Sequence, residues 1–334
     1  MKLRLAQLLG KTRLPRALLA MRRLGGSPWV TVLGYHRAGA MGAATEYDDG
    51  VVDVTPEAFE RQVVFLKRWC NVVDNDQMLA FARGAKLPKN PVHLTFDDGY
   101  LDNHDVVMPI LQRHGIKATF FVATSYVEER RLFWWDRIAF LVKTSKKEVF
   151  DLDYPHPMRI PRAQAFKTLT RIVKDHYALD LERFLDRVAA AADVSLSREE
   201  ERRRVDALLM TWDHVRALRR GGMDVQSHTS THRVMQTLPP AALARELAGS
   251  KRKLEDVLGE RVRSISYPVG KPIGKTPHIR DAVREAGYEL GFTNCTGVNH
   301  AWSFDPLDAR RVSTDAAESD ADFHAMIAVP YLAT

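Results

Sequence analysis

The chain contains few cysteines. Its 334 residues include two, Cys70 and Cys295, which form neither a C-x-x-C pair nor a disulfide framework. A small disulfide-stapled domain is therefore excluded, and the cysteine usage fits a reducing compartment. The composition, 45% hydrophobic and 27% charged, is that of a soluble globular protein. The length suits one large domain, or one domain with an insertion.

Long apolar runs are also missing. No stretch of roughly 18 apolar residues occurs, so the sequence predicts no transmembrane helix. Near the N-terminus, Lys11, Arg13 and Arg16 interrupt any apolar region, which does not fit a secretory signal peptide. We therefore expect a cytoplasmic protein.

Acidic residues are absent from the first 45 positions. Of the 49 Lys and Arg residues, eight precede Glu46, so the rest of the chain carries 41 against 42 acidic residues. A nucleic-acid surface would spread its basic charge over the core, so nucleic acid is not an expected partner. Leucines mixed with Lys and Arg in residues 1–26 predict a basic amphipathic segment, broken near Pro15. It either lies on the anionic inner face of a membrane or packs on the domain with a solvated basic face.

Strand-like and helix-like segments alternate in two parts of the chain. This alternation predicts parallel strands with helices outside them. The expected strands are 29–36, 91–96, 117–124, 224–228, 264–268, 290–294 and 309–313, and the expected helices are 55–69, 103–115, 240–258 and 277–287.

The alternation stops between the two parts, where the sequence becomes mostly helical and highly charged. We therefore predict one α/β domain interrupted by a helical insertion. The predicted boundaries are 1–28 for the basic N-terminal segment, 29–132 for the first half of the domain, 133–220 for the insertion and 221–334 for the second half.

Two adjacent acids, Asp97 and Asp98, directly follow the strand 91–96, and His228 and His232 follow another strand. Each pattern alone is weak, because Asp-Asp-Gly is a good turn and the chain has 12 histidines. Strand ends on one face of an α/β sheet or barrel converge on one cleft, however. One carboxylate and two imidazoles make an open site for a divalent metal, and the second aspartate can then remain a base.

The motifs that carry these residues resemble a known family. In order, they are TFDDGY at 95–100, SHTSTH at 227–232 and SYPVG at 266–270, supported by YHR at 35–37 and HGIKATFFV at 114–122. Together they are similar to the motifs of the NodB-type polysaccharide deacetylases, carbohydrate esterase family 4.

The resemblance implies a distorted (β/α) barrel of the NodB-homology type and a metal-dependent hydrolase. It implies that Asp98, His228 and His232 bind the metal, with zinc expected and cobalt, manganese or nickel as alternatives, and that Asp97 is the catalytic base. By the same analogy, a backbone N–H near Tyr267 would stabilise the oxyanion.

The sequence departs from the family pattern at two points. Many members carry an arginine just before the proline of the third motif, where this chain has Ser264 and Ser266. Arg311, or its neighbour Arg310, could supply that guanidinium. The late Leu-x-His motif that provides a general acid is not clearly present, and neither His324 nor His300 stands in a convincing context.

Four further residues are candidates for substrate contact. Tyr100 closes the first motif, Pro268 shapes the loop of the third, and His36 ends the first strand on the active-site side. Trp134, within FWW at 133–135, could stack on a sugar ring or could anchor the insertion to the barrel.

The leading functional prediction is removal of an acetyl group, expected on nitrogen, from a carbohydrate. A lipid-linked or envelope-polysaccharide sugar is the expected substrate, with peripheral membrane contact through residues 1–26. Two alternatives stay open: a metal-dependent amidase acting on a non-sugar amide or imide, and a non-catalytic glycan-binding relative.

Overall fold

The computed structural model describes residues 12, 14–25, 29–40, 45–314 and 319–330. Seven parallel strands close a barrel in the ring order β1–β13–β11–β10–β9–β6–β5, with β5 returning to β1. The strands are β1 (Trp29–Tyr35), β5 (Pro91–Phe96), β6 (Thr119–Val122), β9 (Asp224–Ser227), β10 (Ser264–Ser266), β11 (Leu290–Thr296) and β13 (Ala309–Ser313). The predicted barrel is confirmed.

Short strands extend this barrel at its margins. They are β4 (Asn71–Val73), which pairs with β5, and β12 (Asn299–His300), which pairs antiparallel with β1. A separate two-stranded sheet is formed by β2 (Arg37–Ala38) and β3 (Val52–Val54).

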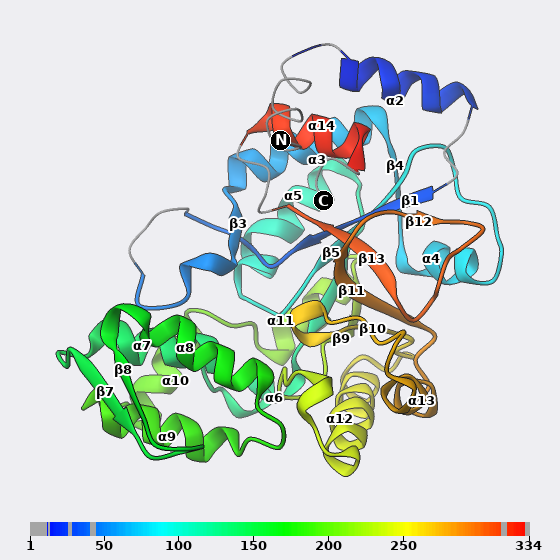
Figure 1. Ribbon diagram of the computed structural model, residues 1–334. Coiled ribbons are helices and arrows are strands. Elements are labelled where there is room, and N and C mark those ends of the chain that lie inside the picture. The colour runs from blue at the N-terminus through cyan, green and yellow to red at the C-terminus, as the bar shows by residue number, and fades with distance from the viewer. Residues whose placement is uncertain (1–11, 13, 26–28, 41–44, 315–318, 331–334) are drawn as a thin grey trace.

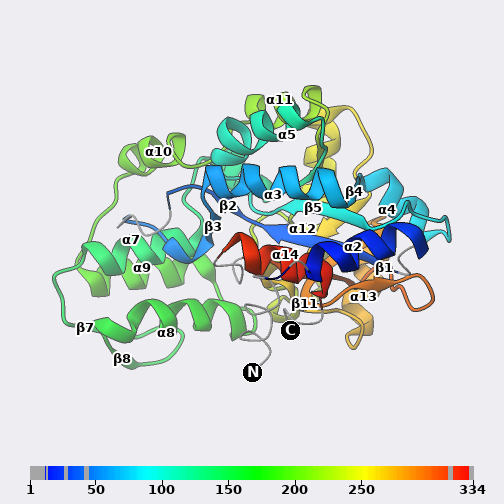
Figure 2. The same ribbon diagram turned by 90° about the horizontal axis from the view of Figure 1, so that it is seen from above.

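Helices surround the barrel (Figures 1 and 2). They are α2 (Leu14–Gly25), α3 (Pro56–Trp69), α4 (Asn75–Ala82), α5 (Met108–His114), α6 (Thr124–Glu129), α11 (Trp212–Arg220), α12 (Pro240–Leu258), α13 (Pro277–Glu285) and α14 (Asp320–Ala328), with short turns η1 (Asp49–Val51), η2 (Asn103–Val107), η3 (Met235–Thr237) and η4 (Pro268–Gly270).

The local chemistry of α3 and α5 explains their limits. Thr55 caps α3 by accepting the Ala58 N–H, and Pro56 occupies the first turn, where its missing N–H has no helical partner to lose. Gly115 ends α5 in the left-handed conformation.

The insertion folds as a separate layer with its own apolar core, beside the barrel in Figure 1. Its elements are α7 (Trp134–Thr144), β7 (Val149–Leu152), β8 (Met158–Pro161), α8 (Arg162–Asp175), α9 (Leu181–Ala192) and α10 (Arg198–Asp206). The hairpin β7–β8 was not predicted, because three prolines within 153–162 resemble a connector. The core of the insertion extends to Leu209, whereas α11 packs on β9 and α12 of the barrel, so the predicted boundary at 220 lies one helix too late.

Helix α2 packs against α14 and α3. Leu19 is fully buried, and the Arg22 guanidinium donates to the Ile327 carbonyl at 3.0 Å. Leu24 and Met21 remain exposed on the same helix. The part of the predicted amphipathic segment before this helix lies outside the described residues, and membrane contact stays a prediction. Among the helices that the structure describes, none has the length and apolarity needed to cross a bilayer.

The barrel core contains a cluster of aromatic rings. Phe96, which is fully buried, stacks on Tyr35 and Phe120 at centroid distances of 5.0 and 5.1 Å, and meets the edge of Phe59 at 5.5 Å. Because Phe96 immediately precedes Asp97, this packing fixes the point where the strand opens into its functional loop.

We expect Phe96→Ala to lower the free energy of unfolding by about 3–5 kcal/mol, because it removes buried apolar surface and leaves a cavity. Urea denaturation followed by circular dichroism measures the change. Val64→Ala on α3, where the side chain is 49% exposed, is the control and should change stability by less than about 1 kcal/mol. Equal effects of the two substitutions would contradict this account of the core.

Candidate active site

The candidate site lies where the barrel strands end. Asp97 and Asp98 follow β5, and His228 follows β9. In parallel strands these carboxyl ends lie at one mouth of the barrel, so residues far apart in sequence meet there. The Asp97 N–H donates to the Tyr35 carbonyl at 2.8 Å, and the His228 N–H to the Val122 carbonyl at 3.0 Å. Both loops are therefore bonded to neighbouring strands.

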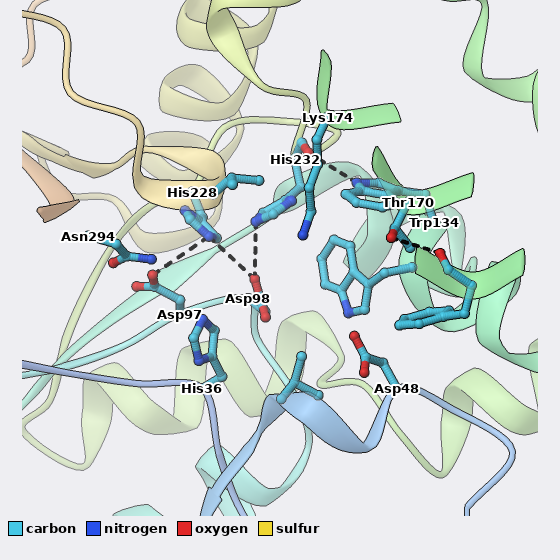
Figure 3. Close-up of a pocket in the computed structure, with 14 residues that line it drawn as sticks. His36, Asp48, Asp97, Asp98, Trp134, Thr170, Lys174, His228, His232 and Asn294 are labelled. Atoms are coloured by element: carbon cyan, nitrogen blue, oxygen red, sulfur yellow. Dashed lines mark hydrogen bonds and ion pairs between the residues drawn. The ribbon is translucent and has the colours of Figure 1, made fainter. Parts of the chain in front are cut away.

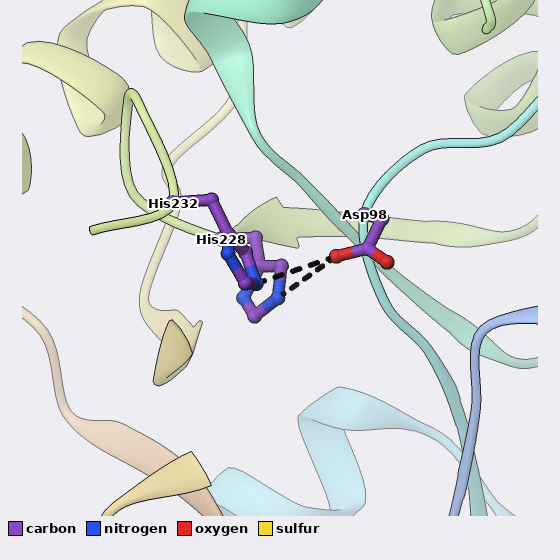
Figure 4. A group of neighbouring side chains, drawn as sticks. All are labelled: Asp98, His228 and His232. Atoms are coloured by element: carbon purple, nitrogen blue, oxygen red, sulfur yellow. Dashed lines mark ion pairs between the residues drawn. The ribbon is translucent and has the colours of Figure 1, made fainter. Parts of the chain in front are cut away.

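Asp98, His228 and His232 form a buried group (Figure 4). One Asp98 oxygen, Oδ1, lies 3.3 Å from His228 Nε2 and 3.5 Å from His232 Nε2. The three potential ligand atoms all lie within 4.8 Å of one another. Ligand atoms about 2.0–2.1 Å from a tetrahedral zinc ion are about 3.4 Å apart, so the spacing suits such an ion.

The chemistry of these side chains also suits a metal. His228 Nδ1 contacts the Ser266 carbonyl at 2.8 Å, which orients Nε2 toward Asp98. Burial, together with the neighbouring His228, lowers the pKa of His232 to about 3, so its imidazole is neutral and can bind a cation. Asp98 Oδ1 is buried with no hydrogen-bond partner among the described residues. A cation would satisfy it.

Asp97 lies next to the Asp98–His228–His232 group and pairs with Arg311. The two guanidinium nitrogens donate to the two carboxylate oxygens at 2.9 and 2.8 Å, and Ser266 Oγ donates to Asp97 Oδ2 at 3.0 Å. Although burial raises the pKa of Asp97, the Arg311 charge and hydrogen bonds lower it well below its ordinary value. Asp97 is therefore ionised.

Arg311 is itself only 2% exposed, and it is further bonded to the Thr293 carbonyl and to Thr95 Oγ1. The structure thus selects Arg311 over Arg310, the alternative that the sequence left open. Arg310 points to the outside of β13, since successive side chains of a strand face opposite ways.

Asp97 and Asp98 line a cavity of about 240 Å³ (Figure 3). Three parts of the chain line it. The barrel strands and the segments that follow them contribute His36, Asp97, Asp98, His228, His232, Val269 and Asn294. The segment around η1 contributes Asp48 and Val51, and the insertion contributes Trp134, Trp135, Phe166, Thr170 and Lys174.

His36 is half-buried and faces the cavity from the end of β1. Its ring Nδ1 lies 3.4 Å from Asp53 Oδ1, and its backbone N–H donates to the same carboxylate. Burial lowers the pKa of the imidazole, but the charge and hydrogen bond of Asp53 and the nearby site carboxylates raise it to about 10. His36 is thus a protonated group at the cavity. No motif or spacing in the sequence pointed to its partner Asp53.

The structure places other predicted residues outside the cavity lining. Tyr100 is fully buried, and its hydroxyl donates to Asp136 Oδ2 at 2.8 Å, so a substrate contact is not supported. The Tyr267 N–H donates to the Phe292 carbonyl at 3.0 Å, and the Tyr267 hydroxyl donates to the Leu307 carbonyl at 2.7 Å. The Tyr267 amide is therefore already engaged and does not face a substrate.

The loop of the third motif reaches the cavity two residues later. Pro268 is buried behind it, and Val269 lines the cavity with φ +61° and ψ −1°. A β-branched residue rarely adopts this left-handed conformation, so the loop holds it there against a local energetic cost.

Trp134 lines the cavity and is only 1% exposed. Its indole Nε1–H donates to the His232 carbonyl at 3.2 Å, and Trp135 stacks on Phe133 at 4.4 Å. These contacts favour the anchoring role of the FWW segment. They also connect the insertion directly to the His232 loop.

The two histidines that were weighed as general acids lie elsewhere. His324, on the outer helix α14, stacks on Phe65 of α3. His300, in β12, stacks on the nearby Trp302. Of the described histidines, the cavity is lined by His36, His228 and His232.

Comparison with known proteins agrees with the fold and the motifs. The sequence profile of the family described as polysaccharide deacetylase matches residues 84–291. YxkH of Bacillus subtilis (strain 168), provisionally named a polysaccharide deacetylase, is 20% identical over 220 residues, which cover 66% of this chain and 50% of that protein. The chain thus matches about half the length of that relative.

Two solved structures share the fold. The Streptococcus pyogenes deacetylase PplD, solved in complex with acetate, has a TM-score of 0.56 at 18% identity, covering 85% of this chain and 92% of that one. BC0361, a polysaccharide deacetylase from Bacillus cereus, has a TM-score of 0.56 at 18% identity, covering 90% of this chain and 69% of that one. Since the profile matches more than half of the chain, with the Asp97–Asp98 and His228–His232 motifs inside it, the chain belongs to the polysaccharide deacetylase family.

Proposed function

We propose that this protein is a metal-dependent hydrolase that removes an acetyl group from the nitrogen of an amino sugar. The observation that carries the proposal is the pairing of Asp97 with Arg311 directly beside the Asp98–His228–His232 group. Both a cation site and an oriented carboxylate base thus face one cavity.

A divalent ion held by Asp98, His228 and His232 would act as a Lewis acid on the acetyl carbonyl and would lower the pKa of bound water. The metal-dependent part of the proposal rests on these three side chains.

Asp97 would take a proton from the attacking water. Its pairing with Arg311 keeps the carboxylate ionised and fixes its orientation. Oδ2 accepts from both Arg311 and Ser266, whereas Oδ1 accepts only from Arg311 among the described residues and so retains a lone pair for an incoming proton.

His36 would supply the proton to the leaving amine. It lines the cavity, and the charge and hydrogen bond of Asp53 raise its pKa and favour its protonated form. The backbone of Val269, in place of Tyr267, is the segment of the third motif that could meet the substrate carbonyl.

The two alternative functions differ in whether they need the buried Asp97 carboxylate beside the cation site. A non-catalytic binding protein has no need of a buried carboxylate beside a cation site. An amidase acting on a non-sugar amide or imide would use the same groups, so the first assay should compare an N-acetylated chito-oligosaccharide with a simple amide and a cyclic imide.

We expect Asp97→Asn to reduce acetate release from the chito-oligosaccharide by about 10²–10⁴-fold, because it removes the base. Bound metal, measured by mass spectrometry of the purified protein, should stay near that of the wild type. Asp281→Asn, on the exposed surface of α13, should change neither quantity. If the Asp97 variant retains full activity, the assigned base is wrong.

Removal of the metal should abolish activity and lower the melting temperature. The ion binds the folded chain, so its loss takes away stabilisation that depends on its concentration and affinity. Dialysis against a chelator, followed by thermal unfolding and by readdition of zinc, cobalt, manganese or nickel, checks both effects. His232→Ala should bind less metal, and its melting temperature should no longer respond to the chelator.

Arg311→Met should lower the free energy of unfolding by about 3–5 kcal/mol, because it leaves the Asp97 charge buried without its partner. The neighbouring, exposed Arg310→Met should cost less than about 1 kcal/mol. In any Arg311 variant that folds, including Arg311→Lys, loss of the bidentate pair should raise the pKa of Asp97. The acidic limb of the kcat/KM profile should then move to higher pH, and an unmoved limb would contradict the proposed role of the pair.

A further inference from the structure

The insertion forms one wall of the cavity. Phe166, Thr170 and Lys174 of α8 all line it. They are spaced four residues apart, so they lie on one face of the helix. In Figure 3 the Lys174 side chain runs beside the His232 ring, and its amine points into the group of side chains that line the cavity. The insertion therefore contributes a positively charged side chain to the cavity in addition to forming one of its walls.

Contacts with the barrel hold this end of α8 in place. Lys271, which follows η4, donates through Nζ to the Lys174 carbonyl at 3.3 Å and to Asp175 Oδ1 at 3.2 Å. Just beyond the helix, the Ala178 N–H donates to the Thr237 carbonyl at 2.8 Å. The backbone of Lys174 is thus fixed relative to the barrel loops.

The charge of Lys174 is available to a ligand. No carboxylate among the described residues lies within 4.0 Å of its amine, although many other lysines of the chain form such pairs, including Lys143 with Asp49 and Lys271 with Asp175. The side chain is half-buried and faces the cavity rather than the outer surface. A cation in this position lacks the protein partner that burial normally requires.

Three carboxylates also face the cavity, and none of them forms an ion pair with Lys174, although the Lys174 charge acts on Asp48 over a longer distance. Asp97 is paired with Arg311, and Asp98 would be neutralised by the metal. Asp48 accepts the Gly50 N–H, and in Figure 3 it lies at the opposite side of the view from the Lys174 backbone. The α8 side of the cavity therefore presents a positive charge that has no ion-pair partner among the described residues.

We propose that the insertion selects an anionic substrate, with Lys174 binding a carboxylate or phosphate group on the acetylated sugar or on the unit next to it. A charge-assisted hydrogen bond from an ammonium to an anionic oxygen is roughly twice as strong as a neutral one, and it discriminates against a neutral analogue. This inference rests on the proposed deacetylase function and names the substrate class of the same site.

The experiment compares three N-acetylated sugars that differ in charge: a neutral N-acetylglucosamine glycoside, its counterpart with a carboxylate at C6, and N-acetylglucosamine 1-phosphate. kcat/KM for acetate release is measured for wild type, Lys174→Met and Lys174→Arg. Lys167→Met is the matched control, because it removes the same charge from an exposed position two turns earlier on α8.

We expect the wild type to prefer at least one anionic sugar. Lys174→Met should lower kcat/KM for that sugar about tenfold more than for the neutral one. Lys174→Arg should keep part of the preference, and Lys167→Met all of it. The anion preferred by the wild type identifies the group as carboxylate or phosphate.

The inference is overturned if the wild type does not discriminate by charge, or if Lys174→Met lowers kcat/KM equally for all three sugars, since the residue would then act in catalysis or packing. If the wild type releases no acetate from any sugar, the proposed function fails separately. The same sugars can then be titrated calorimetrically into the unaltered protein, where a Lys174-dependent preference for the anion still supports the inference and its absence overturns it.

Discussion

A buried pairing between a carboxylate and a guanidinium is the interaction on which the rest of the site depends. Asp97 and Arg311 are 214 residues apart and come from β5 and β13, which are joined through β1. Neither charge could be buried alone without a cost of several kcal/mol. The barrel must therefore close in the register that brings them together, and the same register brings His228 beside Asp98.

The two apolar cores meet at this point. The barrel core contains the aromatic cluster around Phe96, and the insertion core contains the FWW segment together with Tyr100 and Tyr126 from the barrel half. Between them, Asp136 accepts hydrogen bonds from the Tyr100 hydroxyl and the Asp48 N–H, at 2.8 and 3.0 Å. Burial raises the pKa of Asp136 to about 7. This polar contact fixes the segment that carries Asp48 against the insertion, so the cleft has walls from both units.

Local backbone conformation is unusual around the site. Asp98, Thr229, His232 and Val269 all have positive φ, between +51° and +79°, although none is glycine. Such conformations cost of order 1–3 kcal/mol each and persist only where surrounding contacts hold them. Here the loops turn sharply after each strand, so that the side chains point back into the barrel mouth.

The sequence by itself determined the alternating strands and helices and the strand-end motifs that carry Asp97, Asp98, His228 and His232, because these are local patterns, and the resemblance of the motifs to the NodB-type deacetylases implied the barrel. It also put Arg311 among the candidates, but only the closed barrel separated it from Arg310, since that choice depends on which face of β13 points inward. Lys174 and Asp53 carried no local signal. Packing of the insertion brings Lys174 to the cavity, and packing of β3 brings Asp53 to His36, so distant residues meet without any pattern in the residues around them.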